Sequence, residues 1–130
     1  MTHLEVKNYL AQINSLMEYI KEENIKNITL SYALQRNLER LIKSDTDFMK
    51  CADPELLEIE EKARGLADDF KEGLSLLTAE ERLRRDVLVK KFFEDMQGEA
   101  DVELFRVDIN DIKHLEIGIE YSYLLSKLIK

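Results

Sequence analysis

Apolar residues recur at three- and four-residue steps through most of the chain, and this spacing is what most constrains its fold. The first such run extends from Val6 to Ile20, and Thr2 and Glu5 ahead of it match the T-x-x-E capping box. Residues spaced in this way share one face of an α-helix. Because the chain has one proline and four glycines, few breaks are enforced, and long amphipathic helices are predicted.

Two more helices are expected before residue 75. The next periodic run covers residues 30–49 and weakens over residues 44–47. Asp53 followed by Pro54 is typical of an N-cap with proline at the first helical position. A third helix should therefore begin there and continue to Gly73, which we expect to act as its C-terminal cap.

The remaining residues predict further helices around one extended piece. Thr78 and Glu81 form a second capping box before a helix that should end near Gly98. Apolar and charged residues then alternate with period two near residues 102–109, which favours a short extended or β segment. Leucines within 121–128 predict a closing helix. The expected fold is mainly α, with four to five amphipathic helices packed as a bundle or long helical hairpin.

Length and composition point to a single domain spanning residues 1–130. The first residues lack the basic start and apolar run of a signal peptide, and no apolar stretch approaches the roughly 18 residues of a membrane span. The single cysteine, Cys51, has no partner for an internal disulfide. A cytoplasmic protein that does not enter membranes is therefore expected.

The net charge of −8 is concentrated in one segment. Residues 53–81 contain ten acidic and three basic side chains, which gives −7, whereas residues 1–52 balance to zero. Such a field repels nucleic acids and anionic membranes and attracts basic surfaces. We expect no direct nucleic-acid or membrane binding, and a protein partner with a basic surface.

Patterns that would indicate catalysis are missing from the sequence. His3 and His114 lie at opposite ends of the chain, outside any E-x-x-H or H-E-x-x-H frame. Residues 45–47, Asp-Thr-Asp, lack the spaced oxygens of an EF-hand, and no glycine-rich phosphate loop or G-x-S-x-G elbow occurs. Cys51 is expected to behave as a small apolar residue. The sequence predicts no enzyme, no cofactor and no metal site.

The acidic segment has a directional pattern on the third predicted helix. At 100° per residue, carboxylates fall on the side opposite the apolar face, with Gly65 in the middle of the stripe. This acidic stripe is the predicted partner-binding site, and it consists of Glu58, Glu61, Asp68, Asp69 and Glu72. The alternative is that the stripe is only the solvated side of an amphipathic helix. Against that alternative, like charges three or four residues apart repel and cost stability.

The basic side chains between residues 82 and 91 have a simpler explanation. They alternate with acidic ones, and Glu80–Arg84 and Glu81–Arg85 have the favourable i,i+4 order. We expect these pairs to support their own helix.

Two segments carry a resemblance to known proteins. Residues 30–41, Leu-Ser-Tyr-Ala-Leu-Gln-Arg-Asn-Leu-Glu-Arg-Leu, follow the opening helix, and residues 107–112, Val-Asp-Ile-Asn-Asp-Ile, precede the closing one. In these segments, and in the order of elements over most of the chain, the sequence resembles short helical proteins encoded by phages and prophages of Gram-positive bacteria. The resemblance implies a mobile-element accessory protein and supplies no catalytic residues.

Two functions follow as hypotheses. In the first, a nonenzymatic phage-type accessory protein binds a basic partner through the acidic stripe and, in its most specific form, inhibits a host nucleic-acid-binding protein or defence nuclease. In the second, a phage structural or assembly helper acts through apolar helix pairing or self-association as a homo-oligomer.

Overall fold

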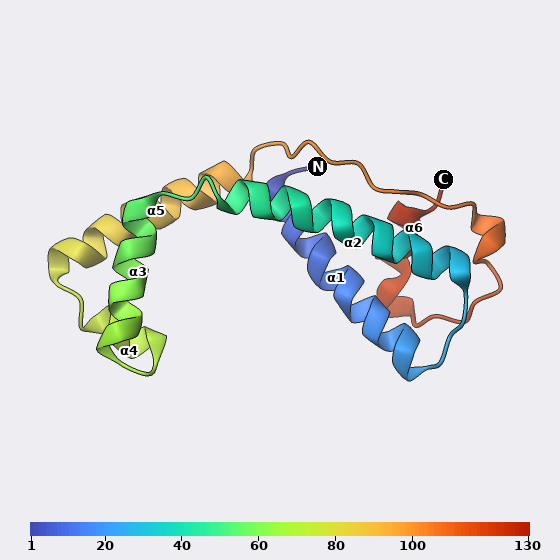
Figure 1. The fold of residues 1–130 in the computed structure, drawn as a ribbon, viewed down its shortest axis with the longest axis horizontal. Coiled ribbons are helices and arrows are strands. Elements are labelled where there is room, and N and C mark those ends of the chain that lie inside the picture. The colour runs from blue at the N-terminus through green and yellow to red at the C-terminus, as the bar shows by residue number, and fades with distance from the viewer. The chain divides into compact units, whose positions relative to one another are not determined.

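The computed structural model describes residues 1–130, and the protein is mainly helical, as predicted (Figure 1). The α-helices are α1 (His3–Glu22), α2 (Ile28–Met49), α3 (Pro54–Leu66), α4 (Phe70–Ser75), α5 (Ala79–Met96) and α6 (Ser122–Leu128), and 3-10 turns lie at η1 (Ile109–Asp111) and η2 (Ile119–Tyr121). There are thus six α-helices, where the sequence predicted four or five. None of them is both long enough and apolar enough to cross a membrane.

The chain divides into two compact units, each with its own apolar core. Residues 1–47 and 99–130 form the terminal unit, and residues 48–98 form the central unit. The single-domain organisation expected from the chain length stays a prediction.

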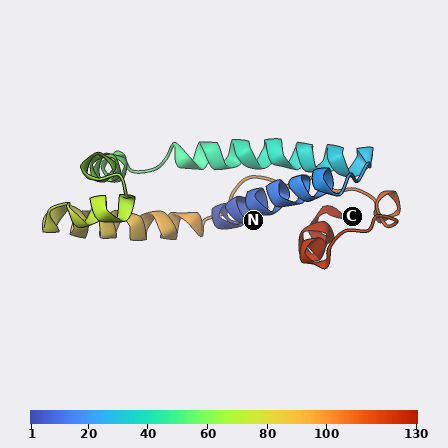
Figure 2. The same cartoon turned by 90° about the horizontal axis from the view of Figure 1, so that it is seen from below.

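The terminal unit is built on α1 and α2, which are neighbouring helices in both views (Figures 1 and 2). Their apolar faces meet side chains from α6 and from residues 100–112 in one core. Its most deeply buried members include Ile13, Leu16, Leu30, Leu34, Leu41, Leu124 and Leu128. The three- and four-residue spacing read from the sequence is therefore the spacing of the buried side chains.

Residues 102–106 lie in the terminal unit without regular secondary structure and run alongside α2 (Figure 1). The period-two pattern there yields one isolated parallel bridge, between Val107 and Ile129. The Val107 N–H donates to the Leu128 carbonyl at 2.8 Å, and the Lys130 N–H donates to the Val107 carbonyl at 2.9 Å. Residues 102–107, called the strip below, are thereby held against the end of α6.

Asn37 fastens the same strip to α2. Its side chain is fully buried, and its amide donates to the Phe105 carbonyl at 2.9 Å while its Oδ1 accepts from the Phe105 N–H at 2.6 Å. Both backbone groups of one non-helical residue are thus satisfied by one side chain, which is the requirement for burying them.

The predicted helix starts are confirmed. Thr2 with Glu5 and Thr78 with Glu81 form reciprocal capping boxes, and the Asp53 side chain accepts from the Glu55 N–H ahead of α3. The apolar periodicity weakens at residues 44–47, but this does not interrupt α2, which continues to Met49.

The third predicted helix is wrong in its extent. α3 ends at Leu66, Ala67 is extended with φ −157° and ψ 157°, and a separate helix, α4, begins at Phe70. Asp69 caps α4, since its side chain accepts from the Lys71 N–H at 3.2 Å. An aspartate gains more at an N-cap than inside a helix, and Gly65 just upstream lowers helix propensity, so the chain breaks between them.

Gly73 is not the C-terminal cap that the sequence predicted. It lies buried inside α4, and a Cβ built on it would stand 2.0 Å from the Ala63 carbonyl oxygen of α3. The glycine therefore lets α4 pack directly on the α3 backbone, which positions the apolar core of the central unit.

Arg84 and Arg85 of α5 bind carboxylates of α3 rather than of their own helix, so the predicted i,i+4 pairs are wrong. The Arg84 guanidinium donates to both carboxylate oxygens of Glu55 at 2.9–3.0 Å. Two further pairs join the helices, Arg85–Glu60 at 3.1 Å and Lys62–Glu81 at 2.7 Å. A partner on a neighbouring helix offers bidentate geometry, which is the stronger form of the Arg–carboxylate contact.

Glu81 gives a pH-dependent contribution to stability. The hydrogen bond from Lys62, with those from Thr78, lowers the pKa of Glu81 from 4.5 to about 2. The folded pKa lies below the unfolded one, so this contribution is fully present above pH 4.5 and is lost as the pH falls toward 2. We expect the difference in unfolding free energy between the wild type and Glu81→Gln, measured by urea denaturation, to shrink over that interval. A difference that stays constant with pH would contradict this assignment.

Candidate functional site

The five residues of the predicted acidic stripe are all exposed on the central unit, but they do not lie on one helix. Glu58 and Glu61 are exposed residues of α3. Asp68 lies in the break after α3, Asp69 caps α4, and Glu72 is in its first turn. The continuous helical stripe is therefore replaced by two groups of carboxylates, one on α3 and one around the start of α4.

None of these five carboxylates forms an ion pair, in contrast to other acidic residues of α3 and α5. Glu55, Glu60 and Glu81 are each engaged by an Arg or Lys of the facing helix. Four basic side chains of the central unit, Lys62, Arg64, Arg84 and Arg85, thus pair with one set of carboxylates, whereas the five residues of the predicted stripe have no ion pair. An unneutralised, exposed set attracts cationic groups at short range.

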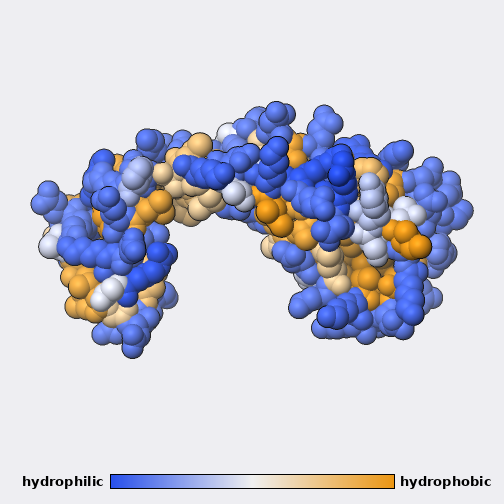
Figure 3. Space-filling view, in the orientation of Figure 1, coloured by the Kyte–Doolittle hydropathy of each residue, from blue (hydrophilic) through white to orange (hydrophobic).

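A groove of about 720 Å³ lies between α3 and α5 beside Glu58. Its lining combines carboxylates with apolar side chains. The apolar residues include Leu83 and Val87, whose side chains are 68% and 58% exposed. Figure 3 shows apolar surface, in orange, interspersed with hydrophilic surface on this unit. Glu80 also lines the groove and, like Glu58, forms no ion pair. A lining that combines apolar side chains with the unpaired carboxylates of Glu58 and Glu80 suits a segment that is both apolar and basic.

Sequence reasoning named Glu58 but missed the groove. The detectable signal was Leu83 and Val87, which are four residues apart on α5 and follow Glu80 by three and seven. Both side chains are exposed, whereas Leu88 of the same helix is buried in the core of the central unit.

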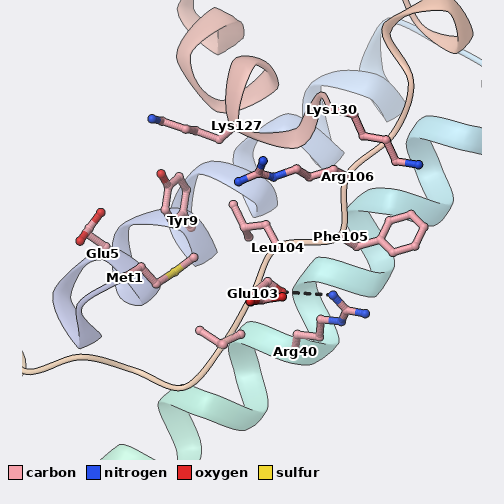
Figure 4. A pocket seen from close by; sticks show the side chains of 11 residues that line it. Met1, Glu5, Tyr9, Arg40, Glu103, Leu104, Phe105, Arg106, Lys127 and Lys130 are labelled. Atoms are coloured by element: carbon pink, nitrogen blue, oxygen red, sulfur yellow. Dashed lines mark hydrogen bonds between the residues drawn. The ribbon is translucent and has the colours of Figure 1, made fainter.

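A second cavity, of about 870 Å³, lies in the terminal unit (Figure 4). It is walled by α1, α2, residues 102–106 and the end of α6. Tyr9 and Leu104 contribute apolar surface, and Arg106 extends from the strip toward α1 (Figure 4). Lys127 and Lys130 close the side formed by α6 and the residues after it.

The walls of this cavity are fixed by the contacts of the strip. Asn37 holds Phe105, so its neighbours Leu104 and Arg106 have set positions. One turn further along α2, Arg40 donates to the Glu103 carbonyl at 3.1 Å and lies over the Phe105 ring at 5.7 Å. The contacts that hold the strip on α2 therefore also fix this wall of the cavity.

Positive charge predominates around the cavity. Its lining includes two carboxylates, Glu5 and Glu103, and the four cationic side chains Arg40, Arg106, Lys127 and Lys130. The Glu5 carboxylate already accepts the Thr2 N–H at the start of α1. None of the four cations forms an ion pair, and Lys127 instead lies over the Tyr123 ring at 5.3 Å.

Tyr9 faces this cavity as a neutral phenol. Burial, and then a hydrogen bond to Tyr123, raises the pKa of Tyr9 above its usual value of 10.0. The side chain therefore contributes ring surface and a hydroxyl but no negative charge at pH 7.

Sequence reasoning missed the cations of this cavity altogether. They come from positions 40, 106, 127 and 130, which no helical or strand period connects. They line one cavity only because the strip is held between α2 and α6, and no local sequence pattern predicts that arrangement.

Comparison with family models, curated proteins and solved structures finds no match for this chain. The structure also contains no group of three or more His, Cys, Asp or Glu side chains arranged to hold a metal ion.

Proposed function

We propose that the chain is a nonenzymatic accessory protein that binds a basic surface of a protein partner through Glu58, Glu61, Asp68, Asp69 and Glu72. The observation that carries the proposal is that all five carboxylates are exposed and none is paired, while neighbouring carboxylates are. Their mutual repulsion is unfavourable in the free protein and is relieved when cationic groups approach.

The most specific form of the proposal is a phage-type inhibitor that occupies the nucleic-acid-binding surface of a host protein or defence nuclease. Such surfaces present Lys and Arg spaced to neutralise phosphates, and exposed carboxylates can replace phosphates as their partners. The groove beside Glu58 adds apolar contact, which pure charge attraction lacks.

Reversing four of the carboxylates should abolish binding. We expect the variant Glu58→Lys, Glu61→Lys, Asp68→Lys and Glu72→Lys to lose roughly a hundredfold in affinity, since four exposed pairs at up to about 1 kcal/mol each become repulsive. Asp69 is left in place because it caps α4. The measurement is quantitative capture of partner proteins from a bacterial lysate by the tagged variant, with circular dichroism to check helicity.

A matched control reverses the same number of charges elsewhere. Glu18, Glu22, Glu23 and Glu116 are exposed in the terminal unit and form no ion pair. Their conversion to lysine should leave capture of the same partner unchanged. Equal loss in both variants would mean that net charge alone governs binding, and no loss in either would remove the proposal.

A second candidate function rests on the exposed apolar side chains of the central unit. Leu57, Leu76, Leu83, Val87 and Phe93 are each more than half exposed. Apolar surface of this kind favours helix pairing with a structural protein or with another copy of the chain. This alternative is a phage assembly helper, and its contacts should respond little to salt.

A further inference from the structure

The cavity of the terminal unit has a composition opposite to that of the whole chain. The protein carries a net charge of −8, yet four cationic and only two acidic side chains line this cavity. None of the four cations forms an ion pair, and their mutual repulsion is offset only in part, by the charge of Glu5 near Lys127. An anion placed among them would remove that repulsion and gain charge-assisted hydrogen bonds.

The cations and the apolar surface occupy different parts of the lining. Arg106 and Lys127 reach the cavity from the strip and from α6, whereas Tyr9 reaches it from α1 and Leu104 from the strip (Figure 4). A ligand that fills both parts needs a multiply charged anionic end and an apolar body. The volume of about 870 Å³ lies within the range of small-molecule sites.

We infer that this cavity binds an organic phosphate, with its phosphate groups on Arg106 and Lys127 and its apolar body against Tyr9 and Leu104. Phosphate groups are favoured over a single carboxylate because a guanidinium, Arg106, and an ammonium, Lys127, reach the cavity from two different elements. This site is independent of the acidic surface of the central unit, so either can exist without the other.

The test is isothermal titration of the full chain with ATP and, separately, with inorganic pyrophosphate. Saturable ATP binding is expected, with a weaker response to pyrophosphate, because only ATP carries an apolar ring. Arg106→Met together with Lys127→Met should weaken ATP binding at least tenfold. Both side chains are exposed and outside any ion pair, so the variant should keep the unfolding midpoint of the wild type.

Lys43→Met together with Lys113→Met is the matched control, since both lysines are exposed, unpaired and outside the cavity. It should bind ATP like the wild type. The inference is overturned if ATP gives no saturable heat, if both variants bind equally, or if pyrophosphate binds as tightly as ATP. Tighter binding of a short oligoadenylate than of ATP would also overturn it, in favour of a nucleic-acid surface.

Discussion

Asn37→Ala is expected to lower the free energy of unfolding by up to about 3 kcal/mol, because it leaves two part-buried backbone groups without partners. The wild-type side chain satisfies both the N–H and the carbonyl of Phe105. Water cannot replace it without opening the strip, since Asn37 is fully buried. The measurement is urea denaturation followed by circular dichroism.

Asn8→Ala is the control for this change. Asn8 is an exposed residue of α1 with no side-chain hydrogen bond, so its replacement should alter stability by less than about 0.5 kcal/mol. If Asn37→Ala were as mild as Asn8→Ala, the strip would not depend on Asn37. Because Phe105 neighbours Arg106, Asn37→Ala should also weaken ATP binding at the cavity.

Gly73→Ala is expected to cost up to about 3 kcal/mol, the upper range for overpacking. The added Cβ would stand 2.0 Å from the Ala63 carbonyl oxygen, and a backbone atom cannot move aside as a side chain can. Relief therefore requires α4 to separate from α3, which would open the core containing Leu77 and Leu88. Thermal and urea denaturation both measure the loss.

Gly65→Ala provides the matched comparison within the same unit. Nothing lies within 4 Å of a Cβ at Gly65, which is exposed near the end of α3. The alanine should be neutral or stabilise by up to about 1 kcal/mol through higher helix propensity. If the two glycine variants behaved alike, the close approach of α4 to α3 would not be a determinant of stability.

The local signals in the sequence were sufficient to place most helix starts. Thr2, Asp53 and Thr78 each cap the helix predicted for them, because capping depends on residues within one turn. The apolar spacing of α1 likewise identified its buried residues. These features need no knowledge of the rest of the fold.

The features that were missed depend on contacts between distant residues. Gly73 and Arg84 were assigned local roles, as a cap and as an i,i+4 partner, but their actual partners are Ala63 and Glu55 on α3. The break of the third helix was a competition between apolar spacing, which favours continuation, and the capping preference of Asp69, which prevailed.

The candidate sites divide in the same way. The acidic residues were identified from composition and spacing, although the helix break changed their arrangement. The cationic cavity was beyond sequence reasoning because Arg40, Arg106 and Lys127 are brought together by Asn37 and by the bridge at Val107. Such a site can be identified only from a structure that gives the position of the strip relative to α2 and α6.

The salt dependence of the captured complex tests the central claim most directly. The tagged chain is incubated with bacterial lysate at about 0.1 M and about 1 M salt, where the screening length falls from roughly 10 Å to 3 Å. A complex held by the exposed carboxylates of α3 and α4 should form at the lower salt, dissociate at the higher, and be absent with the four-lysine variant. Recovery of the same partner, or of a second copy of the chain, unchanged at high salt and with that variant would contradict the account and favour apolar assembly.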